Sequence, residues 1–340
     1  MTSLLTRTDR PLANRWPLRA LAAWLLASTA CSSSAPDAQP VCGAVAPDQR
    51  EACLSDHYFA GAAPLKANLC TVAGASMGTI GKRQEVAFFQ SLAITDADVV
   101  TEGNFLQGFY KPYDLTFFTR SASTGVAFSH AMGGTNEEFL AVQRELGITS
   151  EDVTEEQRAA LNKAVADILF RDLRSFVAGQ SNPPGTRVNV VVLEHIASPD
   201  VAKAFSSGVI GGLGLSPVLF KNIAENDPSK NLFDVLALPS EFTPTLFIGH
   251  SDIVSLAKNP AQVVAHEMGH ALGLEHTDDP GGLMARYEGM VDCQAVLTDA
   301  EVEQLRAAAS RLEAGDSAMV EGARALADAH HRIVADLLRR

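Results

Sequence analysis

Apolar residues recur along this chain with two spacings, one typical of helices and one typical of strands. Over residues 154–178 they follow a helical period, and Thr154 with Gln157 forms a capping-box pattern at its start. Residues 187–196 read RVNVVVLEHI, and such a run of β-branched residues predicts a buried strand. Shorter patterns predict strands over 114–119 and 243–250 and helices over 298–309 and 317–340. This mixture of elements predicts an α/β fold.

A further helix is predicted from residue 260, because Asn259 suits the N-cap and Pro260 suits the first helical position. His266 and His270 are four residues apart. On a helix, this spacing places both imidazoles on one face and one turn apart, so both can reach one metal ion. Glu267 falls on the flank of the same face, where it can contact a metal-bound water without being a ligand.

The residues after this helix provide a third imidazole. Gly273 can adopt the left-handed conformation that ends a helix, and the chain can then fold back to bring His276 to the metal. Three neutral imidazoles leave a tetrahedral zinc with one open position, which is typical of a catalytic site. The alternative is a helix whose histidines only pack or face solvent. Five fixed residues at these spacings would arise by chance with a frequency on the order of 10⁻⁵.

Together with the tight turn that ends at Met284, the pattern His-Glu-x-x-His-x-x-Gly-x-x-His resembles the metzincin clan of zinc endopeptidases, most closely the matrixins. The resemblance implies an α/β zincin fold of the α+β kind, with a twisted mixed five-stranded sheet packed on two long helices and further C-terminal helices. It implies His266, His270 and His276 as zinc ligands, Glu267 as the general base and Met284 beneath the site. It also implies that a polypeptide is hydrolysed by a zinc-activated water.

The chain departs from the family after this methionine. Matrixins carry Pro two residues after the Met, where this chain has Arg286. Astacins and serralysins carry a Tyr at that position that contacts the metal or the transition state; here Tyr287 stands three residues after the Met and is a candidate for the same contact. A calcium ion is left open as an additional cofactor.

Residues 207–216, SGVIGGLGLS, resemble the edge strand of metzincins, which pairs antiparallel with the substrate through main-chain hydrogen bonds. Glycine in a strand lets another backbone approach closely, so Gly208, Gly211 and Gly212 are candidate substrate contacts. The alternative is a plain loop, and residues 233–238 are a second candidate strand.

The first thirty residues predict an export signal, because four arginines lead into an apolar run over 20–30 that is too short for a membrane span. Ser28-Thr29-Ala30-Cys31 resembles a bacterial lipobox, which predicts lipidation of Cys31; cleavage after Ala30 is the alternative. Residues 31–40 would then form a tether. We therefore expect a protein exported from a bacterial cell, either as an outer-membrane or cell-surface lipoprotein or in secreted form.

The cysteines agree with an oxidising compartment. If Cys31 is lipidated, Cys42, Cys53, Cys70 and Cys293 remain, which is enough for two disulfides. Three of the four precede the His-rich motif, so a fully paired scheme must join Cys293 to one of them. As an alternative, the segment around Cys42 is similar to the matrixin propeptide, whose thiolate binds the zinc and keeps the enzyme latent.

The whole chain has a net charge of −13, and residues 1–30 with four Arg and one Asp carry +3, which leaves −16 after their removal. Such an acidic chain argues against nucleic acid as a partner. We predict residues 41–110 as an N-terminal segment or pro-segment, 111–315 as the catalytic domain and 316–340 as a C-terminal helix. Rival functions are a non-catalytic zincin-fold binding lipoprotein and a zinc amidase of peptidoglycan. The oligomeric state is left open.

Overall fold

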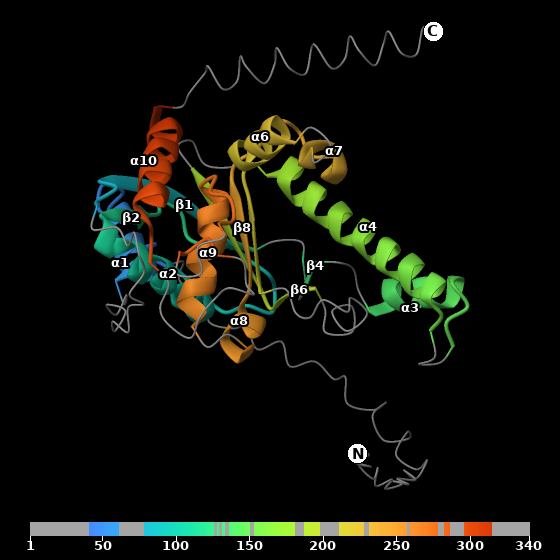
Figure 1. Ribbon diagram of the computed structural model, residues 1–340. Coiled ribbons are helices and arrows are strands. Elements are labelled where there is room, and N and C mark those ends of the chain that lie inside the picture. Colours follow the sequence, from blue (N-terminus) through green and yellow to red (C-terminus); the bar gives the residue numbers. More distant parts are fainter. Residues whose placement is uncertain are drawn as a thin grey trace, which may run out of the picture. The chain divides into compact units, whose positions relative to one another are not determined.

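The computed structural model in Figure 1 describes residues 41–60, 78–125, 128, 131–132, 136–149, 153–180, 187–197, 211–227, 231–256, 259–277, 282–285 and 296–314. All of them lie in one compact unit, Pro40–Arg340, and the other unit, Met1–Gln39, lies outside this set. The predictions for the export signal, the tether and the final helix therefore concern residues outside the described part of the chain. The same holds for Cys31, Cys70, Gly208, Tyr287 and Cys293.

A path of five paired strands forms the centre of the fold. Its order is β2 (Leu115–Phe118), β1 (Lys82–Gln90), β5 (Val188–Leu193), β8 (Thr245–Gly249) and β7 (Gly212–Leu215). Neighbours run parallel except for β7, which is antiparallel to β8. Two smaller pairings stand beside this path: β3 (Thr124–Gly125) with β1, and β4 (Ala131–Met132) with β6 (His195–Ala197). A mixed sheet with one antiparallel edge confirms the predicted fold class.

Strand β5 shows why this sheet is covered on both faces. Every residue of its sequence VNVVVL is buried, as expected for a parallel strand with layers on either side. Val190 pairs with Phe88 and Leu246 of the neighbouring strands, and all three belong to one hydrophobic core. Val191, one residue on, belongs to a second core. The two cores therefore lie on opposite faces of the sheet.

Each face has its own helices. The first core contains residues of α2 (Asp96–Tyr110) and α9 (Pro260–Ala271), which pack side by side (Figure 1), together with residues of α1 (Arg50–Phe59) and α10 (Asp299–Ala314). The second core contains residues of α4 (Glu155–Gly179), α6 (Pro217–Asn226) and α7 (Leu232–Leu236). The remaining helices are η1 (Lys111–Tyr113), α3 (Asn136–Glu145) and α8 (His250–Leu256).

Residues before position 111 contribute to the same sheet and core, which differs from the predicted start of the catalytic domain. Strand β1 precedes the predicted strand over 114–119, which is β2, and lies between β2 and β5 in the sheet. Helix α2 begins with a capping box between Thr95 and Asp98 and packs against α9. Removing all residues up to 110 would therefore take out an internal strand together with α1 and α2, two helices of the first core.

Most of the other predicted elements are confirmed. The strand predicted over 187–196 is β5, and the one over 243–250 is β8. Helix α4 begins at the predicted capping box of Thr154 and Gln157. The alternative strand over 233–238 is wrong, because residues 233–236 belong to α7, whose N-cap is Asn231 and whose C-cap is Ala237.

One disulfide joins Cys42 to Cys53, which reduces the possible partners of Cys293. In a fully paired scheme, Cys293 is then left with Cys70. The pairing also contradicts the alternative in which Cys42 keeps the enzyme latent, because its sulfur is not a free thiolate.

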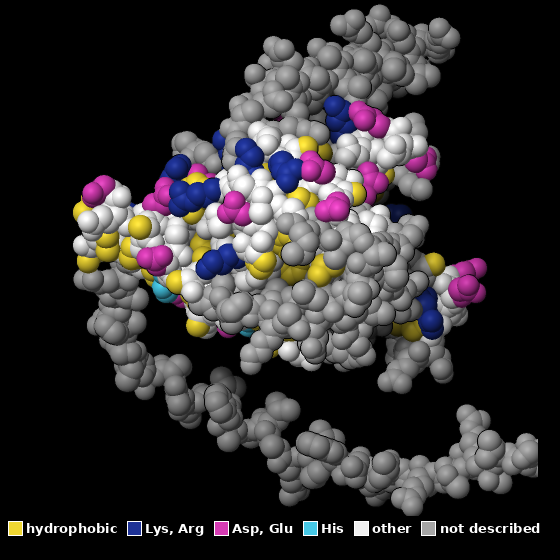
Figure 2. All heavy atoms as spheres, turned by 60° about the vertical axis from the view of Figure 1, so that its left-hand side comes forward, with side chains coloured by type: hydrophobic (Ala, Val, Ile, Leu, Met, Phe, Trp, Pro, Cys, Tyr) yellow, Lys and Arg dark blue, Asp and Glu magenta, His cyan; other side chains and the backbone are white. Residues whose placement is uncertain are grey.

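Figure 2 views the molecule from the side on which α1 and α10 lie in Figure 1, and basic and acidic side chains are interspersed there. Glu51 of α1, for example, accepts hydrogen bonds from Arg83 and Arg120. The acidic side chains therefore do not form one continuous negative patch on this face. Of the helices in the described ranges, none combines the length and apolar character that crossing a bilayer requires.

Candidate metal centre

Helix α9 carries the first two histidines of the centre. Asn259 caps it by accepting a hydrogen bond from the Gln262 amide. The helix ends at Ala271, and Gly273 follows with a φ of +99°, a conformation that favours glycine. The chain then reverses, and His276 lies beside His266 and His270.

The three imidazoles point their Nε2 atoms towards one another. The Nε2 of His276 lies 3.3 Å from that of His266 and 3.2 Å from that of His270. Within the described ranges, this is the only group of three or more His, Cys, Asp or Glu side chains close enough to hold an ion. The sequence prediction placed these histidines together, and the structure brings them together.

The other ring nitrogens fix the orientation of two of these imidazoles. The Nδ1 of His266 lies 2.7 Å from the Leu283 carbonyl oxygen, and that of His270 lies 2.8 Å from the Leu274 carbonyl oxygen. A carbonyl only accepts hydrogen bonds, so each Nδ1 carries the proton and each Nε2 keeps its lone pair. Burial lowers the pKa of His266 to about 4 and that of His270 to about 3. Both rings are neutral at pH 7, which fits a zinc ligand set.

Glu267 lies between these ligands and the edge strand. Its Oε2 accepts a hydrogen bond of 2.8 Å from the Gly214 amide of β7. Burial raises the pKa of Glu267 to about 7, which is suited to taking up and releasing a proton near neutral pH. A bound cation would lower this pKa again, because an opposite charge favours the carboxylate.

Met284 lies directly under the helix that carries the ligands. Its side chain is fully buried, and its sulfur occupies the space where a Cβ at Gly269 would be. Its carbonyl accepts a hydrogen bond of 2.9 Å from the Thr277 amide, one residue after His276. The turn thus supports His266 through Leu283 and supports the segment of His276 through Met284.

Glu301 of α10 holds this turn, a contact that sequence analysis missed. One carboxylate oxygen accepts from the Met284 amide at 3.0 Å, and the other accepts from the Thr298 amide at 2.6 Å. The pattern of Thr298 and Glu301 was visible as a helix cap, but the sequence does not show that the same carboxylate reaches the methionine turn.

The candidate substrate strand is only partly described. Gly212 begins β7, the antiparallel edge of the path, and the carbonyl of Gly211 accepts from the Gly249 amide of β8. The empty Cβ position of Gly212 faces Glu267. The backbone of α9 comes close to this strand at Gly214, and contact between substrate and Gly208, Gly211 and Gly212 stays a prediction.

Three further histidines in the described ranges have carboxylate partners outside the three-histidine group. The Nε2 of His57 lies 2.6 Å from Asp96. The Nδ1 of His250 lies 2.6 Å from Glu102, and its Nε2 lies 3.2 Å from Asp98. The Nδ1 of His195 lies 2.8 Å from Asp252.

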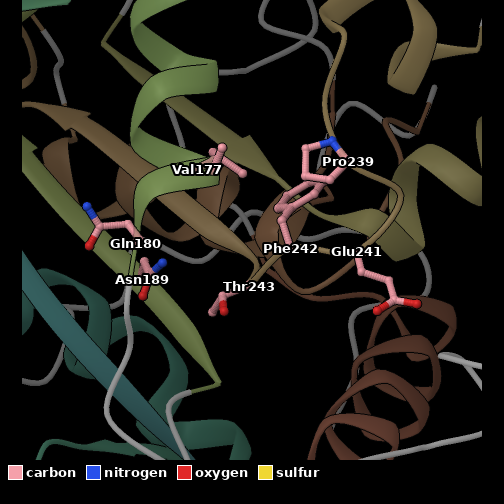
Figure 3. Close-up of a pocket in the computed structure, with 8 residues that line it drawn as sticks. Val177, Gln180, Asn189, Pro239, Glu241, Phe242 and Thr243 are labelled. Atoms are coloured by element: carbon pink, nitrogen blue, oxygen red, sulfur yellow. The ribbon is translucent and has the colours of Figure 1, made fainter.

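A cavity of about 270 Å³ opens elsewhere, between the end of α4 and the start of β5 (Figure 3). In Figure 3, Asn189 and Gln180 lie on one side of it, and the carboxylate of Glu241 points away from them. None of its lining residues belongs to the three-histidine group, so this cavity is separate from the metal centre.

The site resembles that of a matrixin-like metzincin. It has two helical histidines one turn apart, a third after a glycine turn, a buried methionine turn and an antiparallel edge strand. The matrixin family model, Peptidase_M10, matches residues 143–307 of the chain. A solved structure described as metalloproteinase-II from Bacteroides fragilis is 14% identical, with 73% of this chain and 59% of that chain covered and a TM-score of 0.32. No curated protein matches. The matched region ends within α10 and includes the three histidines, the methionine turn and Glu301.

Proposed function

We propose that the protein is an exported zinc endopeptidase. The observation that carries this proposal is the convergence of three imidazole nitrogens near Glu267, which lies on the same helix as His266 and His270. His266, His270 and His276 would hold the zinc, which supplies a Lewis acid that polarises a carbonyl and makes water a stronger nucleophile. The matrixin match supports a metallopeptidase and implies zinc.

In this proposal, Glu267 handles the proton. Its carboxylate would accept a proton from the attacking water and deliver it to the nitrogen of the departing amine. The outer edge of β7 would bind an extended polypeptide by main-chain hydrogen bonds.

Two rival functions make different use of the same site. A non-catalytic binding protein has no need of Glu267, because three imidazoles suffice to hold zinc. A peptidoglycan amidase would use both the metal and the carboxylate, so only its substrate distinguishes it. The edge strand favours an extended peptide over a branched muropeptide.

The test is a digestion assay on the exported protein with a peptide library and, in parallel, with purified muropeptides. We expect cleavage inside peptides, loss of cleavage with a zinc chelator and its return with added zinc. Cleavage of muropeptides alone would replace the endopeptidase with the amidase. Stoichiometric zinc without cleavage of either substrate would favour the binding protein.

The location of the protein is part of the same proposal. The leader over residues 1–30 and the lipobox-like sequence before Cys31 support export and a lipid anchor. An anchored protease would act on polypeptides at the bacterial surface or in the surrounding medium.

A further inference from the structure

Two glycines of the edge strand have no space for a side chain. A Cβ at Gly212 would lie closer than 3.0 Å to the Cγ of Glu267. A Cβ at Gly214 would lie closer than 3.0 Å to the Glu267 carbonyl oxygen and 2.7 Å from the Cβ of His270. Real Cβ atoms essentially never come that close. Because the two glycines are two residues apart, they present the same face of the strand to α9. Leu215, which alternates with them, belongs to the core on the other face.

The Gly214 amide adds a directed contact. The Gly249 amide donates to the Gly211 carbonyl, so the backbone hydrogen-bonding groups of Gly211 point towards β8. In an antiparallel ladder the same holds for every second residue, and Gly214, three residues further on, is not among them. The Gly214 amide therefore points away from β8. Its N–H donates instead to the Oε2 of Glu267 at 2.8 Å.

We propose that Gly212 and Gly214 are positioning residues that hold the general base. The space at Gly212 accepts the methylene groups of Glu267, and the Gly214 amide binds its carboxylate. The two contacts leave the side chain one orientation, beside the three imidazoles. This inference rests on the proposed role of Glu267 as general base and adds the residues that set its geometry.

Gly212→Ala is the direct test, because the three heavy atoms nearest to its new methyl group all belong to the flexible side chain of Glu267. We expect zinc content and melting temperature close to wild type, kcat lower by at least about tenfold and KM little changed, since a displaced base affects the chemical step and not ground-state binding. Gly125→Ala is the matched control, a strand glycine with nothing within 4 Å of its Cβ position. It should behave like wild type.

Repeating Gly212→Ala in a Glu267→Ala variant shows whether Gly212 acts by positioning Glu267 or only by packing. In Glu267→Ala the Cγ is absent, so adding Gly212→Ala should cause no further loss of residual activity or stability. An equal loss in both backgrounds would show a merely structural glycine and overturn the proposal. If Gly212→Ala alone does not fold, a folded double variant supports the proposal, and a double variant that also fails to fold overturns it.

Wild-type cleavage is measured first, which separates this inference from the proposed function. A wild-type protein that binds zinc but cleaves no peptide refutes the proposed function. An active wild type with an unchanged kcat in Gly212→Ala refutes only the positioning role.

Discussion

Replacing Glu301 with Ala should loosen the turn beneath the metal. This carboxylate is 2% exposed and accepts hydrogen bonds from the amides of Met284 and Thr298. Its removal leaves the buried Met284 amide unpaired, at about 1–3 kcal/mol, and the half-buried Thr298 amide partly exposed to water, so we expect the free energy of unfolding to fall by about 1–4 kcal/mol. For a domain of this size each kcal/mol lowers the melting temperature by about 2–4 °C.

The same change should weaken zinc binding. The turn supports His266 through the Leu283 carbonyl and the segment of His276 through the Met284 carbonyl. Loss of the hydrogen bonds that orient metal ligands typically lowers metal affinity by about 10–100-fold.

The assays for Glu301→Ala are chemical denaturation and a competitive zinc titration. Glu303→Ala is the control, because Glu303 is on the same helix but its side chain is 70% exposed, and surface ion pairs contribute little. If Glu301→Ala unfolds with the free energy of the control and binds zinc as wild type does, the carboxylate does not hold the turn.

Three other predictions concern pH, anchoring and disulfide pairing. The hydrogen bond to Glu102 raises the pKa of His250 above its ordinary value of 6.5. The contact therefore stabilises the fold fully below pH 6.5, and this stabilisation is lost as the pH rises through the raised pKa. His250→Gln should therefore flatten the decline of melting temperature above that pH, and equal slopes in both proteins would contradict the reasoning. Cys31→Ser should move the protein from the membrane fraction to the soluble exported fraction, whereas unchanged fractionation would refute lipidation. Peptide mapping without reduction should find Cys70 joined to Cys293; a free Cys293 thiol in the exported protein would exclude that pair.

The metal centre could be predicted because its geometry is local. Two ligands are one helical turn apart, and the third needs only the reversal at Gly273. Strand β5 could be predicted for a similar reason, since burial on both faces requires a continuous apolar run. In both cases neighbouring residues carry the whole signal.

Strand β1 was missed because its sequence hides its burial. Gln84 and Glu85 are polar, yet both are almost fully buried inside this strand. Glu85 pairs with Arg120 from beyond β2, a contact between segments 35 residues apart that no periodicity reveals. The Gly214 amide and Glu267 are likewise separated by 53 residues. Contacts of this kind depend on strand order, which the sequence pattern did not determine.

Zinc content and peptide cleavage, measured together in Glu267→Ala and His270→Ala, separate metal binding from proton transfer. We predict that Glu267→Ala keeps about one zinc per chain, because three imidazoles remain. It should lose at least about 10²–10⁴-fold in activity with its general base. His270→Ala should lose both zinc and activity, because two ligands remain. Near wild-type cleavage by folded Glu267→Ala would contradict the account.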